Sequence, residues 1–307
     1  MTLLVFAGLF IPIMIFGLSV YFFRLSNKNL KLLVAFSGAF LLSLTFTKFV
    51  PHIYSGLDNE PAHEVHMHGS EEGNIQPHEH HHDHGVACTE QHPAGEAKQN
   101  HDHGHAHGHG HAHGAAKIIG LFILLGFFIQ LILDYLTKGV EHGHLHSKCP
   151  DQDHNGHDHA GRHSVAYWPV LVGLSLHSFL ESMPLAKGFE EPALQNHLLI
   201  GIIIHNIPIS IVFMSLLIQN KVSKVKAAIL LAAFGLSGPA GVLVSSLVGT
   251  HFVADMDMFF RFSIAIVVGI FLHISTTILF ETDENHRFNL MKFAVIILGA
   301  LAAMFHF

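Results

Sequence analysis

The sequence predicts an all-α fold: a polytopic membrane bundle of eight transmembrane helices. Half of the 307 residues are hydrophobic, only 13% are charged, and Phe alone supplies 26 residues. Such a composition is typical of a chain that crosses a bilayer repeatedly and not of a soluble protein with one large core. The apolar residues also fall into eight runs, each close to the ~20 residues that a helix needs to cross the hydrocarbon layer.

The eight predicted helices follow these apolar runs. They cover residues 2–23, 32–54, 116–136, 166–189, 197–219, 225–248, 262–280 and 288–305. The first run has no basic residue before it and no small-x-small cleavage site, so we interpret it as a helix and not as a secretory signal. The second is interrupted near its end by Lys48, Pro51 and His52. The sixth contains GLSGPAG at 235–241, and such small residues permit close helix packing.

The basic residues predict how the bundle is oriented. An even number of spans puts both termini on the same side, and eleven of the 16 Lys and Arg residues then fall in the loops of the opposite side. The positive-inside rule therefore predicts that both termini lie outside. The resulting division is helices one and two (1–54), an external loop (55–115), helix three (116–140), a cytosolic loop (141–163) and helices four to eight (164–307).

Histidine is concentrated in these two long loops. Of the 31 His residues, seventeen lie between His52 and His113 and seven between His142 and His163. The loops contain few bulky apolar residues, so we expect disorder without metal. Neutral imidazoles without fixed geometry bind zinc and copper with little selectivity, which suggests that the outer loop gathers metal and the inner loop holds it. The alternative is that the His-rich loops are only solvated spacers with no role in handling metal.

Two neighbouring predicted helices carry polar clusters inside apolar runs. His177, Ser178 and Glu181 lie in the fourth helix, and His205 and Asn206 lie in the fifth. His177 and Glu181 are four residues apart and share one face of a helix. A carboxylate inside a bilayer costs several kcal/mol and marks a functional site by default, and imidazole beside carboxylate is a metal-ligand pairing. The alternative is that these groups only form hydrogen bonds that hold the helices together. We favour a metal site over this alternative, because a carboxylate such as Glu181 is energetically costly inside a bilayer.

The same residues resemble a known family. HSFLESMPLAKG (177–188) is similar to the fourth-helix signature of the ZIP (Zrt/Irt-like) metal transporters, and HNIPIS (205–210) falls where that family's fifth helix carries its signature. The eight spans, Pro51, the GPAG segment and Glu281 at the end of helix seven extend the resemblance along most of the chain.

The resemblance implies a transporter of divalent metal ions, most simply zinc, and not an enzyme. The metal would bind between helices four and five and move into the cytoplasm across the plasma membrane, or the inner membrane of a bacterium. By position, the resemblance implies five ligands: His177, Ser178, Glu181, His205 and Asn206. It also implies a homodimer in the lipid bilayer, no nucleic-acid partner, and no cofactor beyond the transported ion.

The chain departs from the family pattern at Ile209, where many members have a second carboxylate, and helix six offers no acidic residue. We therefore expect one intramembrane metal ion, with a preference for zinc-like ions because Glu181 is the sole carboxylate. Further polar residues could line the route: His52 at the outer end of helix two, and Asp134, His273 and Glu281 toward the inner ends of helices three and seven. Each of these could equally be a satisfied interfacial group.

Three other functions fit parts of the sequence. A cation-diffusion-type exporter also carries His-rich loops, but usually has six spans and Asp-rich intramembrane sites. A membrane di-iron oxidase or desaturase needs several H-x-x-H boxes at helix ends, whereas the spacings here (His78 to His81, His154 to His157) fall in the His-rich loops. A metal-sensing receptor without transport is the third, and metal flux separates it from a transporter. The chain has no Gly-rich nucleotide-binding loop, which argues against ATP-driven pumping.

Overall fold

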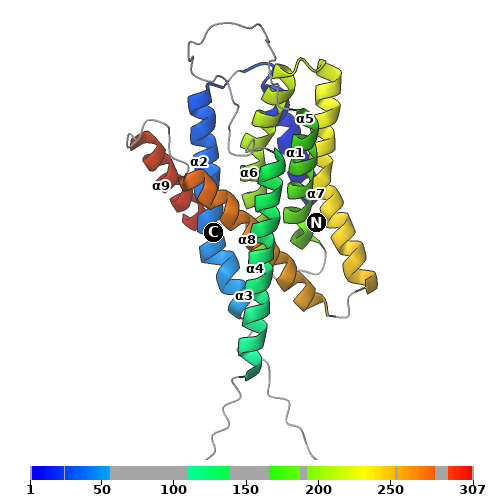
Figure 1. Cartoon of the computed structure of the whole chain (residues 1–307), viewed down its shortest axis with the longest axis vertical. Coiled ribbons are helices and arrows are strands. Elements are labelled where there is room, and N and C mark those ends of the chain that lie inside the picture. The colour runs from blue at the N-terminus through cyan, green and yellow to red at the C-terminus, as the bar shows by residue number, and fades with distance from the viewer. Residues whose placement is uncertain are drawn as a thin grey trace, which may run out of the picture.

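Helices make up all regular structure in the described part of the chain. The computed structural model (Figure 1) describes residues 2–23, 25–55, 110–137, 166–186, 192–252, 255–280 and 290–305. The elements are α1 (Thr2–Ser19), α2 (Asn27–Leu44), the π-helical segment η1 (Thr45–Phe49), α3 (Val50–Ser55), α4 (Gly110–Thr137), α5 (Tyr167–Ser182), the 3-10 turn η3 (Met183–Leu185), α6 (Pro192–Gln219), α7 (Lys224–Phe252), α8 (Met256–Phe280) and α9 (Leu290–Phe305). The all-α prediction is confirmed, and a helix lies in each of the eight apolar runs.

Several of these helices can cross a membrane. Five stretches are long and apolar enough by length and composition: Asn27–Ser55, Gly114–Thr137, Pro192–Gln219, Lys224–His251 and Met256–Leu279. Two shorter apolar helices cover Leu3–Ser19 and Leu290–Phe305. Large apolar side chains are exposed along α1, α4, α7 and α9, as expected for surfaces that face lipid. The multi-span character is thus confirmed, whereas the total of eight spans and the side of the termini remain predictions.

The second predicted helix is divided by a π-helical segment. The N–H of Val50 bonds the carbonyl of Thr45, five residues earlier, in place of the usual four. The cause is Pro51, which has no N–H to donate and whose ring crowds the carbonyl of Thr47 in a regular α-helix. One wide turn placed just before the proline accommodates this conflict. Lys48 lies in that wide turn, and His52 follows in α3.

Small residues bring α7 against α5, the helix that carries the first polar cluster. A Cβ added at Gly241 would overlap the backbone carbonyl of Phe179. Only a residue without a side chain allows the two backbones to approach this closely. The prediction of close packing by the segment 235–241 is confirmed. At this point α7 packs directly against the backbone of α5.

Helix α4 is held against α8 in the same way. A Cβ at Gly126 would overlap the carbonyl of Ile266, and a Cβ at Gly269 would overlap that of Ile123. These reciprocal contacts fix the height at which α4 crosses the bundle. They therefore determine where the polar residues further along α4, Gln130 and Asp134, meet the neighbouring helices.

The helices form two groups that meet around α5 and α6. Helices α1, α5, α6 and α7 pack on one another, and α2, α4, α8 and α9 form a second set. Contacts of α4 with α5 and of α2 with α6 join the sets. Figure 1 shows α4 in green extending past the rest of the bundle at the end where α3 also lies. The polar clusters of α5 and α6 thus lie in the interior of the bundle.

Candidate metal site

The five predicted metal ligands of α5 and α6 are buried. The relative exposure is 0% for His177 and Glu181 and 2% or less for Ser178, His205 and Asn206. None of these side chains points to where lipid would lie. A carboxylate so deeply enclosed needs partners, because an unpaired buried charge is strongly destabilising.

The position of the cluster follows from the way in which α5 ends. Pro184 cannot donate a backbone hydrogen bond, so the α-helix stops at Ser182 and continues as a 3-10 turn. His177 and Glu181 therefore occupy the last two turns of α5, and α5 is only 16 residues, about 24 Å, long. In a regular α-helix the carbonyl of Leu180 would accept from position 184, where Pro184 has no N–H to donate. The N–H of Met183 bonds that carbonyl in the 3-10 turn.

Each oxygen atom of the Glu181 carboxylate lies close to one polar side chain. Its Oε2 lies 3.1 Å from Nε2 of His177, one turn earlier on α5. Its Oε1 accepts a hydrogen bond from Nδ2 of Asn206 on α6, at 3.0 Å. The ring of His205 lies edge-on to that of His177, with 5.6 Å between the ring centroids. The structure thus brings together four of the five predicted ligands through direct contacts.

Three buried oxygen atoms of this cluster accept no hydrogen bond from the described residues. One is the carboxylate oxygen Oε2 of Glu181, and the two neutral ones are Oγ of Ser178 and Oδ1 of Asn206. Buried polar atoms are generally satisfied, so such oxygens require an explanation. The two neutral oxygens are donors of the kind that complete the coordination of a divalent cation.

The chemistry of the cluster fits a zinc-like ion, although its present geometry is incomplete. In a tetrahedral zinc site with bonds of 2.0–2.1 Å, two ligand atoms are about 3.3 Å apart, close to the separation of His177 Nε2 and Glu181 Oε2. Within the described ranges, however, no group of three or more His, Cys, Asp or Glu side chains is arranged to hold a metal ion. An ion bound by His177, Glu181 and His205 together would therefore require at least one of these side chains to move.

Helix α7 lies beside the cluster at Gly238, which has no side chain. A Cβ added at Gly238 would lie 3.3 Å from Oγ of Ser178 and 3.1 Å from Oγ of Ser182. In addition, Ile209 of α6 is a buried apolar residue at 2% exposure. Neither helix supplies a second carboxylate.

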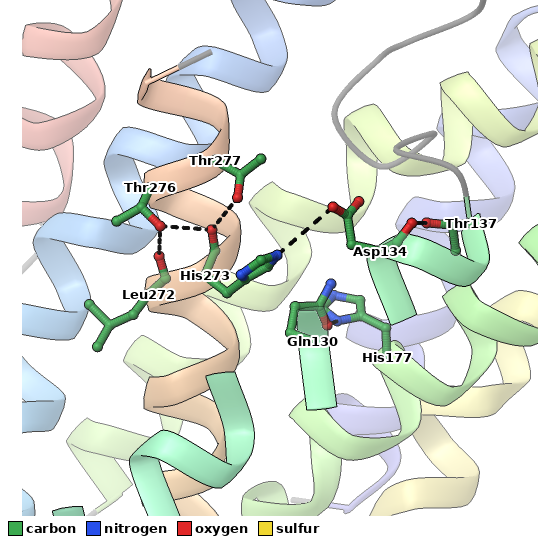
Figure 2. Close-up of polar contacts among 8 residues, drawn as sticks. All are labelled: Gln130, Asp134, Thr137, His177, Leu272, His273, Thr276 and Thr277. Atoms are coloured by element: carbon green, nitrogen blue, oxygen red, sulfur yellow. Dashed lines mark hydrogen bonds and ion pairs between the residues drawn. The ribbon is translucent and has the colours of Figure 1, made fainter. Parts of the chain in front are cut away.

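A residue that sequence reasoning did not assign to the site completes it on the side of α4. Oε1 of Gln130 lies 3.0 Å from Nδ1 of His177, and both side chains are fully buried. Figure 2 shows the two side chains in contact. The available signal was a glutamine in the apolar middle of this helix, but the sequence does not say which neighbour it meets.

Two predicted path residues meet at a separate place, between α4 and α8. Oδ2 of Asp134 lies 3.9 Å from Nε2 of His273. Figure 2 marks this contact with a dashed line. Phe127 packs edge-on to the His273 ring, with 4.9 Å between the centroids. Asp134 follows Gln130 by one turn of α4, so this helix contacts His177 through one residue and His273 through the next on the same face.

Of the two remaining predicted residues, His52 and Glu281, the structure describes His52 alone. His52 lies in α3, a helix that packs against α8. Glu281 lies outside the described residues, as do nearly all of the His-rich stretch 55–115 and the whole of 141–163.

The comparisons with known proteins agree with these features. A sequence model described as ZIP zinc transporter matches residues 61–306, whereas a comparison with curated proteins gives no match. The matched range includes every residue of both polar clusters and argues against the exporter and the di-iron enzyme. The match covers most of the chain, and the protein therefore belongs to the ZIP family, whose members carry divalent metal ions across membranes.

Proposed function

We propose that this protein carries zinc, or a closely related divalent metal ion, into the cytoplasm through a single site between α5 and α6. The ligands would be His177, Ser178, Glu181, His205 and Asn206. The observation that supports this most is the placement of Glu181, a fully buried carboxylate that lies between an imidazole and an amide. This group compensates for the loss of the ion's hydration water, which is the main obstacle to crossing the bilayer.

The donor set favours a borderline ion over a hard one. Two imidazoles and one carboxylate suit zinc, whereas magnesium, calcium and manganese prefer sites richer in oxygen. With an apolar Ile209 and no side chain at Gly238, the site has one negative charge, which supports one ion and not a pair. Entry of the ion would draw the His205 ring toward Glu181, and release would reverse this movement.

The pair of Asp134 and His273 is our proposed next position along the inward path. Both groups are metal-ligand types, and Gln130 lies on α4 between them and the α5–α6 cluster. His52 would lie on the outer part of the route and Glu281 on the inner part, as the sequence predicts.

The orientation that we propose has eight spans, both termini outside, and the His-rich loop 55–115 outside as well. The protein would lie in the plasma membrane, or in the inner membrane of a bacterium, as a homodimer. The two cysteines test the orientation, because Cys88 lies in the outer loop and Cys149 in the inner one. A membrane-impermeant thiol reagent added to intact cells should label the Cys149→Ser variant and leave the Cys88→Ser variant unlabelled. The reverse pattern would invert the topology.

Zinc flux in proteoliposomes tests the transport site. Wild-type protein should admit zinc to a trapped fluorescent indicator, and Glu181→Ala and Glu181→Gln should each lower the rate at least ten-fold. His251→Ala is the matched control, because His251 is an exposed imidazole near the end of α7. Wild-type flux in both Glu181 variants would rule out this site. An absence of zinc flux in the wild-type protein would favour the metal-sensing receptor.

A further inference from the structure

In the hydrogen bond between Gln130 and His177, the atoms in contact determine which residue is the donor. Nδ1 of His177 lies 3.0 Å from the carbonyl oxygen Oε1 of the Gln130 amide. That oxygen carries no proton, so the proton in the contact belongs to Nδ1, and His177 donates. A neutral imidazole has only one N–H group, and therefore its Nε2 keeps a lone pair.

That lone pair points to Glu181. Nε2 of His177 and Oε2 of Glu181 are buried 3.1 Å apart, so in this neutral tautomer two electron-pair donors face each other. Two such atoms repel unless a cation lies between or beside them. The tautomer selected by Gln130 is thus the one in which His177 and Glu181 together attract a metal ion.

The opposite orientation of the amide would have the opposite effect. If the NH2 group of Gln130 donated to Nδ1, the proton of His177 would lie on Nε2 and would bond Glu181 directly. His177 would then be satisfied by the protein alone and could not bind a metal through Nε2. The identity of the Gln130 atom in contact with His177 therefore decides whether the site can accept an ion.

We propose that Gln130 is a positioning residue that holds His177 as its Nδ1–H tautomer, so that Nε2 is the metal-binding atom. This inference rests on the proposed transport site. Residues that accept a hydrogen bond from a metal-binding imidazole fix its tautomer and ring orientation, and their loss typically lowers metal affinity 10–100-fold. Gln130 does this from a different helix, at a separation of 47 residues in sequence from His177.

Zinc flux kinetics of two Gln130 variants provide the first test. Gln130→Leu removes the acceptor and should raise KM about ten-fold or more. Gln130→Glu keeps an acceptor and, as a carboxylate, has no proton to donate, so its KM should stay at or below the wild-type value, while a slower release lowers kcat. Gln195→Leu is the matched control, because Gln195 is also buried but donates to the carbonyl of Leu185. Equal increases in KM for the two Gln130 variants, or for Gln130→Leu and Gln195→Leu, would overturn the proposal.

Nitrogen NMR of the full chain supplies a readout that a purely structural role would not affect. The protein is labelled with 15N-histidine and loaded with 113Cd, and the His177 signals are those that disappear in His177→Ala. We expect a protonated Nδ1 and a direct cadmium coupling to Nε2. A protonated Nε2, or a coupling to Nδ1, would overturn the proposal.

The flux data separate this inference from the function on which it rests. Wild-type flux in the Glu181 variants would reject the α5–α6 site itself. Loss of flux in the Glu181 variants, together with an unchanged KM in Gln130→Leu, would retain the site and reject the role of Gln130.

Discussion

Asn206 of α6 donates its side-chain amide to Glu181 of α5, with 3.0 Å between Nδ2 and Oε1. This bond crosses the interface between the two helices that carry the proposed ligands. It holds the carboxylate with one oxygen toward α6 and the other toward His177. The orientation of Glu181 therefore depends on both helices at once, and a change in Asn206 should act on transport through Glu181.

We expect Asn206→Leu to lower zinc flux at least ten-fold. The substitution leaves Oε1 of Glu181 without its donor in a buried position, where the loss of a partner costs about 1–3 kcal/mol. Asn220→Leu serves as the control. Asn220 directly follows α6, and its side-chain amide donates to the carbonyl of Leu216, away from the cluster. Flux is measured in proteoliposomes, and comparable rates for the two variants would contradict the role assigned to Asn206.

Asp134→Asn should slow transport with little effect on the apparent affinity for zinc. Asp134 faces His273 and not the α5–α6 cluster, so its charge should act after the ion has left the first site. We predict a fall in kcat with a KM within about two-fold of wild type, measured from the initial rates of zinc entry. Asp257→Asn, at an exposed aspartate in the first turn of α8, controls for the loss of one charge. A larger change in KM than in kcat would place Asp134 at the first site instead.

Gly238→Ala should impair transport more than Gly235→Ala, although the two glycines are similarly crowded. A Cβ at Gly238 would lie 3.1 Å from Oγ of Ser182 and 3.3 Å from Oγ of Ser178, inside the proposed site. A Cβ at Gly235 would also meet an atom at 3.1 Å, but that atom belongs to Phe10 of α1. Rates of zinc entry compare the two variants at equal protein loading. Equal losses would mean that crowding of α7, and not the Ser178 position, controls the rate.

Gly241→Ala should destabilise the whole bundle. Its new Cβ would overlap the carbonyl of Phe179, so α5 and α7 would have to move apart, at a cost of about 1–3 kcal/mol. Thermal unfolding in detergent should therefore begin at a lower temperature. Gly114→Ala is the control, because a Cβ at Gly114 has no atom within 4 Å. An unchanged melting temperature for Gly241→Ala would show that the crossing is looser than the structure indicates.

The helices were predictable from the sequence because their causes are local. The length of an apolar run decides whether it can cross a bilayer, and Pro51 and Pro184 act on carbonyls within four residues. The physical form of these interruptions was less predictable. A π-helical turn precedes Pro51, and Pro184 lies in a 3-10 turn in which the N–H of Met183 bonds the carbonyl of Leu180.

Most of the candidate metal ligands could also be predicted from the sequence. The i, i+4 spacing of His177 and Glu181 already places both on one helix face, and Asn206 and His205 stand out against an apolar helix. Gln130 could not be assigned in this way. Its partner lies on another helix, and the height at which α4 passes α5 depends on glycine contacts with a third helix, α8.

By itself, the sequence determined that this protein is a membrane bundle with buried imidazole and carboxylate groups on two neighbouring helices, because hydropathy and helical spacing are properties of short segments. Only the tertiary structure decided which faces meet: Asn206 against Glu181, Gln130 against His177, and Asp134 against His273. The physical reason is that close approach of backbones at Gly126, Gly241 and Gly269 sets the heights of the helices, and a hydrogen bond of 3 Å exists only at the right height.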